Sequence, residues 1–275
     1  MDDILRIVTQ NLNKAYKDIT DKDYTNHYKK NIQADIYAFQ EVNKGGNSRI
    51  TEFHISESFP SDKINILEAT QAKDSWNNTF HKEKYIKGNS PWEYSFRDGF
   101  WKEATLTYKN ETIKIINIHL SNYFNEQFRF LLTKYLYDLE KSFKNVLLLG
   151  DFNTAEYHQT EAPNTWAQAM YHTITDIFNY KELFADNETL ENPHHTLVYT
   201  HKNGEETAKK LDHIFVSPKL YIKLREWGFR VRYIDEVNIN KEKLQNNKKD
   251  TISCKIEAFT DHSGIFLEIG TLINP

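Results

Sequence analysis

The sequence of 275 residues predicts a single α/β domain. Short apolar runs that end at turn residues recur along the chain, and such runs are typical of buried strands. One amphipathic helix separates two of these runs, and this strand–helix–strand order indicates a crossover between parallel strands. The chain has no internal repeat, no low-complexity segment and no linker rich in Pro, Gly and Ser. We therefore assign residues 1–275 to one domain.

The first half of the chain predicts strands that end in polar residues. A strand over residues 4–9 is followed by a polar segment over 24–33, which we expect to be helical. A second strand is expected over 34–39, and residues 50–111 are expected to form strands and loops. The run TIKIINIHL predicts a further strand over 112–120.

The crossover and the remaining strands follow in the second half. Apolar residues fall on one helical face between residues 128 and 143, and the next strand runs from Val146 to Leu149. Residues 164–185 are expected to be helical with an irregular end. Two strands over 196–200 and 211–216 are expected to pair around an Asn-Gly turn. The last two strands are expected over 229–234 and 263–269.

The composition excludes several classes of protein. With 35 basic and 39 acidic side chains the net charge is −4, so any binding of a polyanion must use a local patch. The single Cys254 cannot form an internal disulfide, which fits a reducing compartment or a secreted protein without bridges. No signal peptide is visible, and no stretch approaches the roughly 20 apolar residues of a membrane span. We expect a cytoplasmic monomer that does not insert into a membrane.

Six strands place a chemically capable polar side chain at or near one end. These side chains are Asn11, Glu41, His119, Asp151 with Asn153, Asp212, and Asp261 with His262. A single case is typical of a turn, but six cases with four carboxylates indicate a site that is assembled on a rigid scaffold. Two carboxylates 4 Å apart repel each other by about 4 kcal/mol at an effective dielectric constant near 20.

A divalent cation would relieve this repulsion. Oxygen ligands suit Mg²⁺, Mn²⁺ or Ca²⁺, and the sequence has no cluster of Cys and His with the spacing of a zinc site. Carboxylates, histidines and an amide around such a cation suit the hydrolysis of a phosphate ester.

Six ordered motifs resemble those of the endonuclease/exonuclease/phosphatase superfamily, the DNase I-like or exonuclease III-like proteins. The motifs are Ile7-Val-Thr-Gln-Asn11, Asp35-Ile-Tyr-Ala-Phe-Gln-Glu41, Asn117-Ile-His119-Leu, Gly150-Asp-Phe-Asn153, Leu211-Asp-His-Ile-Phe-Val216 and Thr260-Asp-His262. The resemblance spans residues 4–269 and implies a four-layer α/β sandwich, in which two mixed β-sheets pack face to face with helices outside.

The resemblance also implies a role for each motif residue. Glu41 is the expected principal metal ligand, with Asn11 assisting and Asp261 as a further ligand for Mg²⁺ or Mn²⁺. Asp212 is expected to orient His262. The resemblance leaves open whether Asp151 or His262 takes the proton of the attacking water.

The remaining expected contacts are with the substrate. His119 and Asn153 resemble donors to the phosphate oxygens in the transition state. Tyr123, Arg129 and His195 are candidate substrate contacts, for which capping, surface charge and an ordinary loop position are the alternatives. His213 is expected to point away from Asp212, because neighbouring residues of a strand face opposite sides.

Position 119 disfavours the abasic-site branch of the family, and two motifs depart from the usual residues without loss of a functional group. His119 is found in the DNase I, deadenylase, sphingomyelinase and tyrosyl-DNA phosphodiesterase branches, whereas abasic-site endonucleases usually have Tyr there. The first motif has Gln10 where Trp is commoner, and the last has Thr260 where Ser is usual.

Three functions are compatible with the sequence. The first is a metal-dependent phosphodiesterase that acts on DNA or RNA. The second is the same chemistry on sphingomyelin or an inositol phosphate, which the net acidity favours mildly and the absence of a long apolar hairpin disfavours. The third is a binding module without catalysis, which the intact acidic and His positions disfavour. Fold membership alone does not fix the substrate.

Overall fold

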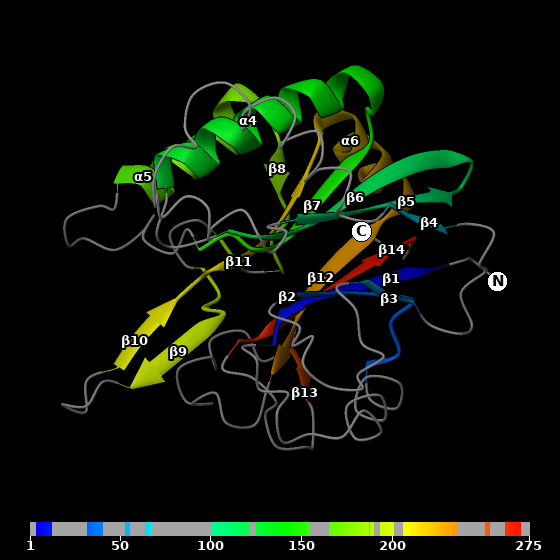
Figure 1. Cartoon of the computed structure of the whole chain (residues 1–275). Helices are drawn as coiled ribbons and strands as arrows, with labels where there is room; N and C mark the ends of the chain where they lie inside the picture. The colour runs from blue at the N-terminus through cyan, green and yellow to red at the C-terminus, as the bar shows by residue number, and fades with distance from the viewer. Residues whose placement is uncertain are drawn as a thin grey trace, which may run out of the picture.

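A computed structural model of the chain shows two six-stranded sheets that pack face to face (Figure 1). The structure describes residues 4–12, 32–40, 53–55, 64–67, 101–120, 125–153, 165–186, 188–189, 193–200, 206–235, 251–253 and 262–270. Most of the helix predicted over 24–33 lies outside these residues.

Each sheet is mixed, as predicted. We call them the first and the second sheet. The first sheet has the order β13 (Thr251–Ser253), β12 (Phe229–Asp235), β14 (Gly264–Ile269), β1 (Leu5–Asn11), β2 (Ile36–Gln40) and β3 (Phe53–Ile55). The second has the order β4 (Ile64–Leu67), β5 (Trp101–Tyr108), β6 (Glu111–His119), β7 (Val146–Asp151), β11 (Asp212–Val216) and β8 (Lys181–Glu182). In the first sheet β1 is parallel to β2 and antiparallel to β14. In the second β6 is parallel to β7, and β11 is antiparallel to β7.

Two helices cover the outer face of the second sheet (Figure 1). The crossover helix α4 (Asn125–Ser142) connects β6 to β7 and confirms the predicted crossover. Beside it lies α5 (Thr165–His172), which continues into the π-helical turn η5 (Thr173–Ile177). Within the described ranges, no helix is both long and apolar enough to cross a membrane.

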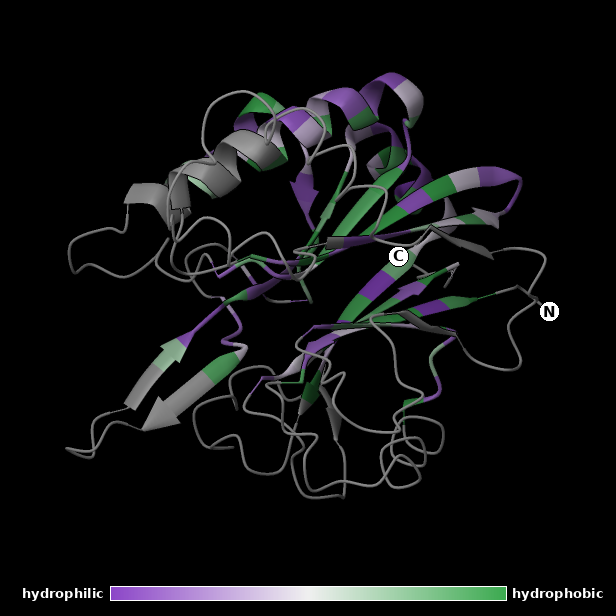
Figure 2. Cartoon of the chain, viewed as in Figure 1, coloured by the Kyte–Doolittle hydropathy of each residue, from purple (hydrophilic) through white to green (hydrophobic). Residues whose placement is uncertain are grey.

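The strand β7 shows why the sandwich has two apolar layers. Leu147 and Leu149 belong to the core between the sheets, whereas Val146 and Leu148 pack under the helices. Both sets are buried because successive side chains of a strand face opposite sides. Figure 2 shows hydrophobic colour along the central strands of both sheets. A continuous apolar run is therefore what a strand between these two layers requires.

The helix α6 (Pro218–Trp227) joins the second sheet to the first and was missing from the prediction. Leu220 and Leu224 bury their side chains in the core between the sheets. Lys223 lies 3.2 Å from Glu111, at the start of β6, so α6 closes the end of the sandwich that is opposite to His119.

Two predicted elements are wrong in detail. Residues 164–185 are not helical throughout: the helix ends with η5 at Ile177, and Lys181–Glu182 form the edge strand β8. The strand after the Asn-Gly turn is also different. The strand β9 (Leu197–Thr200) pairs with β10 (Glu206–Lys209), whereas the predicted partner at 211–216 is β11 and pairs with β7. The pair β9–β10 extends away from the sandwich (Figure 1).

Candidate active site

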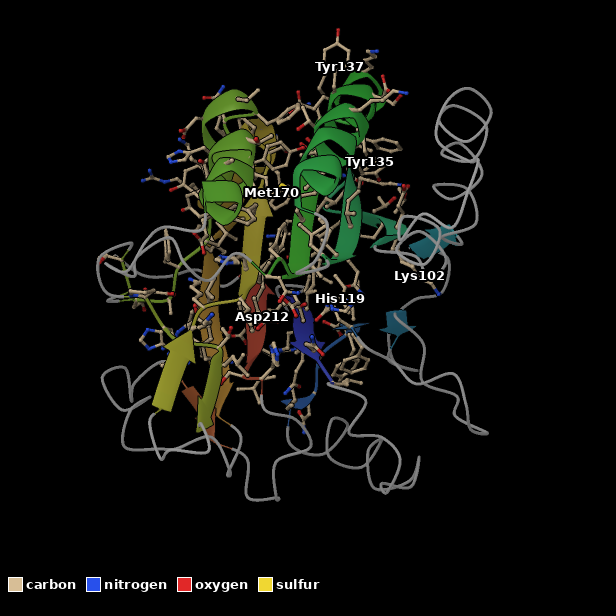
Figure 3. The ribbon with its side chains drawn as sticks, turned by 60° about the vertical axis from the view of Figure 1, so that its left-hand side comes forward. Lys102, His119, Tyr135, Tyr137, Met170 and Asp212 are labelled. Carbon is tan, nitrogen blue, oxygen red and sulfur yellow. The ribbon has the colours of Figure 1, made fainter. Side chains whose placement is uncertain are left out.

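Three strands of the second sheet place polar side chains at the same register. His119 is paired with Asp151 across β6 and β7, and Asp151 is paired with Asp212 across β7 and β11. Because paired residues point to the same side of a sheet, all three side chains face the space between the sheets. Figure 3 shows His119 and Asp212 at this end of the strands, below the two helices.

The first sheet brings further polar groups to the same end. Asn11 is the last residue of β1, and His262 comes shortly before β14. The side-chain amide of Asn11 donates a hydrogen bond of 2.7 Å to Oδ2 of Asp151, which joins the two sheets. These polar groups therefore gather where the strand ends of both sheets meet.

Asp212 and His262 form the predicted carboxylate–histidine pair. Nδ1 of His262 lies 2.8 Å from Oδ2 of Asp212, and both side chains are buried. We infer that Nδ1 carries the proton, because a carboxylate accepts the hydrogen bond. The pair therefore holds the ring in one orientation and leaves Nε2 as the second reactive nitrogen.

Asp151 is fully enclosed and receives a hydrogen bond on each oxygen. The amide of Asn11 donates to Oδ2, and the backbone N–H of Asn153 donates to Oδ1 at 2.8 Å. Burial, reinforced by the negative charge of Asp212, raises the pKa of Asp151 to about 6. A carboxylate with a pKa near the working pH is well suited to accept a proton.

The residues present fit a divalent cation. One ligand atom from each of Asp151, Asp212 and His262 lies within 4.8 Å of the others. Oδ1 of Asp212 is buried and has no hydrogen-bond partner among the described groups. Two carboxylates and an imidazole are ligands that Mg²⁺ and Mn²⁺ accept.

Asn153 and His119 border this cluster. Asn153 has a positive φ of 50°, a conformation that Asn tolerates better than most residues, and its amide donates to the carbonyl of Leu120 at 2.6 Å. Nε2 of His119 lies 4.0 Å from Oδ2 of Asp151, and its side chain is about one-third exposed, with a relative accessibility of 34%. The geometry thus brings Asn11, His119, Asp151, Asn153, Asp212 and His262 together.

The other predicted site residues are less well defined. Glu41, Asp261 and Tyr123 lie outside the described residues, and Arg129 belongs to α4 without a described side chain. His195 is half-buried, and burial together with the charge of Lys210 lowers its pKa. The roles of these residues stay predictions.

Gln10 and Thr196 support the site and were absent from the predicted set. The Gln10 amide donates a 3.1 Å hydrogen bond to the backbone carbonyl of His262. Oγ1 of Thr196 accepts hydrogen bonds from the backbone N–H groups of Leu211 and Asp212. Both residues are fully buried, and their contacts with segments distant in the sequence leave no local signal in it.

A buried ionic cluster surrounds Lys210, two residues before Asp212. Lys210 forms ion pairs with Glu182 at 3.0 Å and with Glu188, and these carboxylates raise its pKa against the effect of burial. Nδ1 of His213 lies 2.8 Å from Glu182. His213 packs on Phe215 and Phe152, which confirms that it points away from Asp212.

A comparison with known proteins finds the same fold. No protein-family model and no curated protein sequence matches the chain. Similar solved structures include the AP endonuclease LMAP from Leishmania major, with a TM-score of 0.59 and 12% identity over 97% of this chain and 88% of that chain. An endonuclease/exonuclease/phosphatase family protein from Leptotrichia buccalis has a TM-score of 0.50 and 18% identity over 96% of this chain and 99% of that chain.

A third similar structure is TDP2 from D. rerio in complex with a single-strand DNA product. It has a TM-score of 0.53 and 11% identity over 98% of this chain and the whole of that chain. At such low identity these likenesses concern the fold.

Proposed function

We propose that this chain, which has the fold of the endonuclease/exonuclease/phosphatase superfamily, is a divalent-metal-dependent phosphodiesterase that cleaves DNA or RNA. The observation that carries the proposal is the buried group of Asp151, Asp212 and His262, whose ligand atoms lie within 4.8 Å of one another. A fold alone does not determine an activity, so the argument rests on this group.

Phosphodiester hydrolysis needs a group that accepts the proton of water. In the proposed reaction, water attacks phosphorus, and the bond to the leaving oxygen on the opposite side breaks. Asp151, with its raised pKa, and Nε2 of His262 are the two candidates for the proton acceptor. The other group then remains in contact with the phosphate oxygens or the leaving oxygen.

The reaction also needs donors for the charge that develops on the phosphate. His119 lies beside Asp151 at the accessible edge of the cluster, and Asn153 follows Asp151 by two residues. Their N–H groups are the proposed donors to the non-bridging oxygens, where hydrogen bonds strengthen as the transition state forms.

A metal site is part of the proposal. Glu41 is the proposed principal ligand of Mg²⁺ or Mn²⁺, with Asn11 and Asp261 assisting, and the carboxylates of Asp151 and Asp212 offer further ligand atoms. Because Nδ2 of Asn11 donates to Asp151, its carbonyl oxygen is the atom suited to a cation. A bound cation would offset negative charge on the phosphate during the reaction.

The proposed substrate class is nucleic acid. TDP2 from D. rerio, which has a similar fold, is in complex with a single-strand DNA product. The chain has a net charge of −4, so the proposed contacts to the polyanion are local and include Arg129, Tyr123 and His195.

The test is a hydrolysis assay of the purified chain and its Glu41→Ala variant. Single-stranded DNA, double-stranded DNA, RNA, sphingomyelin and inositol phosphates are each supplied with Mg²⁺, with Mn²⁺ or with a chelator. Glu226→Ala is the matched control, because Glu226 is an exposed carboxylate on α6, at the end of the sandwich away from His119.

The proposal expects cleavage of nucleic acid that both the chelator and Glu41→Ala abolish and that Glu226→Ala retains. Cleavage confined to lipid or inositol phosphates would replace the substrate class. An absence of metal-dependent turnover on every substrate would overturn the proposed activity.

A further inference from the structure

Thr196 contacts two separate segments of the chain, residues 209–212 and Ser263. Its backbone N–H donates to the carbonyl of Lys209 at 2.8 Å, and its carbonyl accepts from the N–H of Ser263 at 2.7 Å. Its hydroxyl oxygen accepts from the N–H groups of Leu211 at 3.0 Å and Asp212 at 3.1 Å. The residue has no exposed surface, so these bonds form away from water.

These contacts reach both members of the carboxylate–histidine pair. The hydroxyl holds the backbone of Asp212 directly, and the carbonyl holds the residue that follows His262. The next residue, Leu197, forms a β-bridge with His262 itself. Asp212 and His262 are 50 positions apart in the sequence, and Thr196 links the segments that carry them.

The Thr196 hydroxyl, and not the shape of the side chain, is what holds the start of β11 in place. The backbone N–H groups of Leu211 and Asp212 are at the start of β11, where Leu211 and Asp212 are both buried. A buried N–H group that loses its acceptor is costly, so the start of β11 would shift until these groups found another partner. A shift at that point moves the carboxylate that orients His262.

We propose that Thr196 is a positioning residue that fixes Asp212 and His262 relative to each other. It acts through the backbone and not on the substrate. The inference rests on the proposed function for its kinetic consequence, and on the geometry of the pair for its structural one.

The experiment compares Thr196→Val with Thr196→Ser. Val has nearly the shape of Thr but no hydroxyl, whereas Ser keeps the hydroxyl and loses only a methyl group. Thr173→Val is the matched control, because Thr173 is also buried and its hydroxyl donates to the carbonyl of Ala169 at 2.7 Å within a helix.

Two readouts are measured on each protein. The first is kcat and KM for the nucleic acid that the wild type cleaves best, corrected for the folded fraction. The second is the low-field proton resonance of the hydrogen-bonded Nδ1–H of His262, assigned by its loss in His262→Gln. The second readout does not require activity.

Thr196→Val is expected to lower kcat by roughly 10- to 100-fold with KM changed less than about twofold, because misplacement costs rate more than binding. The resonance is expected to broaden or disappear in Thr196→Val and to persist in Thr196→Ser, whose kcat stays within about threefold of wild type. Thr173→Val is expected to retain both kcat and the resonance.

A folded Thr196→Val protein with wild-type kcat and an unchanged resonance would overturn the proposal. If Thr196→Val does not fold, the test uses Thr196→Ser. Loss of the His262 resonance in Thr196→Ser, which retains the hydroxyl, would also overturn the proposal. If the wild type hydrolyses nothing, the resonance alone tests the positioning role, and the failure is assigned to the proposed activity.

Discussion

The Nδ1 atom of His262 lies 2.8 Å from the Oδ2 atom of Asp212, although Asp212 belongs to one sheet of the sandwich and His262 precedes a strand of the other. Asp212 begins β11 in the second sheet, and His262 precedes β14 in the first. The pair therefore depends on the packing of one sheet on the other.

Asp212→Asn tests the role of the carboxylate. The amide that replaces it offers an N–H as well as a carbonyl, so it no longer selects the ring form of His262 that carries its proton on Nδ1. We expect kcat to fall by about 10²- to 10⁴-fold with the fold intact. Steady-state hydrolysis kinetics and thermal unfolding measure the two effects.

Asp138→Asn is the control for this substitution, because Asp138 is an exposed residue of α4 that pairs with Lys141. It is expected to keep wild-type kcat. Wild-type kcat in folded Asp212→Asn would show that the pair has no part in catalysis.

Gly150→Ala tests the close approach of β6 and β7 beside Asp151. Gly150 has a φ of +130°, and a Cβ atom there would lie 2.0 Å from the backbone carbonyl oxygen of Ile118. A backbone atom inside a paired strand cannot move aside, so we expect the free energy of unfolding to fall by more than about 3 kcal/mol. Urea denaturation is the measurement, and a loss below about 1 kcal/mol would contradict this close approach.

Gln10→Leu removes the hydrogen bond to the carbonyl of His262. The leucine leaves a buried carbonyl without this donor, which we expect to cost about 1–3 kcal/mol of stability. Gln10 also packs against Gly264, where a Cβ atom would lie 3.2 Å from the Gln10 side chain. Because the lost bond holds His262, kcat is expected to fall about 3- to 30-fold as well.

Asn145→Leu separates these two effects. The Asn145 amide is also buried, and it donates to Glu111 at 2.9 Å and to the carbonyl of Thr112 at 3.2 Å, at the other end of the second sheet. This variant is expected to lose stability at unchanged kcat. An equal loss of kcat in both variants would mean that Gln10 has no particular effect on His262.

His194→Phe tests the pH dependence of stability. His194 is buried and stacks on Tyr233 with ring centroids 3.6 Å apart, and burial together with the charge of Lys210 lowers its pKa to about 3. The unfolded chain binds a proton at this position below about pH 6.5 and the folded chain does not. The unfolding free energy contributed by His194 is therefore present above pH 6.5 and is lost as the pH falls from 6.5 towards 3.

Between pH 8 and pH 5 this difference is worth about 2 kcal/mol. Urea denaturation at the two pH values should show that wild type loses about 2 kcal/mol more stability than His194→Phe. Equal pH dependence in wild type and His194→Phe would contradict the burial of a neutral imidazole.

The strand ends of the site could be predicted because their signal is local. Val146 to Leu149 must be a strand with two buried faces, so Asp151 must lie at its end. The same reasoning places Asn11, His119 and Asp212. The register that brings Asp212 opposite Asp151 could not be read in this way, because it depends on which strands become neighbours.

The elements and contacts that the prediction missed have a weak sequence pattern or depend on residues far apart in the chain. The strand β10 has the sequence ETAK, which lacks the apolar alternation of a strand, and it pairs with β9. Pro218 after Ser217 is an ordinary helix start. The helix α6 is short and, in the described range Pro218–Trp227, has only two buried residues, Leu220 and Leu224, so its apolar pattern is weak. Gln10 reaches a partner 252 positions away, which no local pattern indicates.

The pairing of β1 with β14 has a consequence for synthesis of the protein. These strands are neighbours in the first sheet, yet Gln10 and His262 are separated by 252 positions. At about 5–20 residues per second, a ribosome makes β14 roughly 13–50 s after β1. Until β14 emerges, β1 lacks one neighbour and Asp212 lacks its histidine, so a nascent chain cannot hold an assembled site during most of its translation.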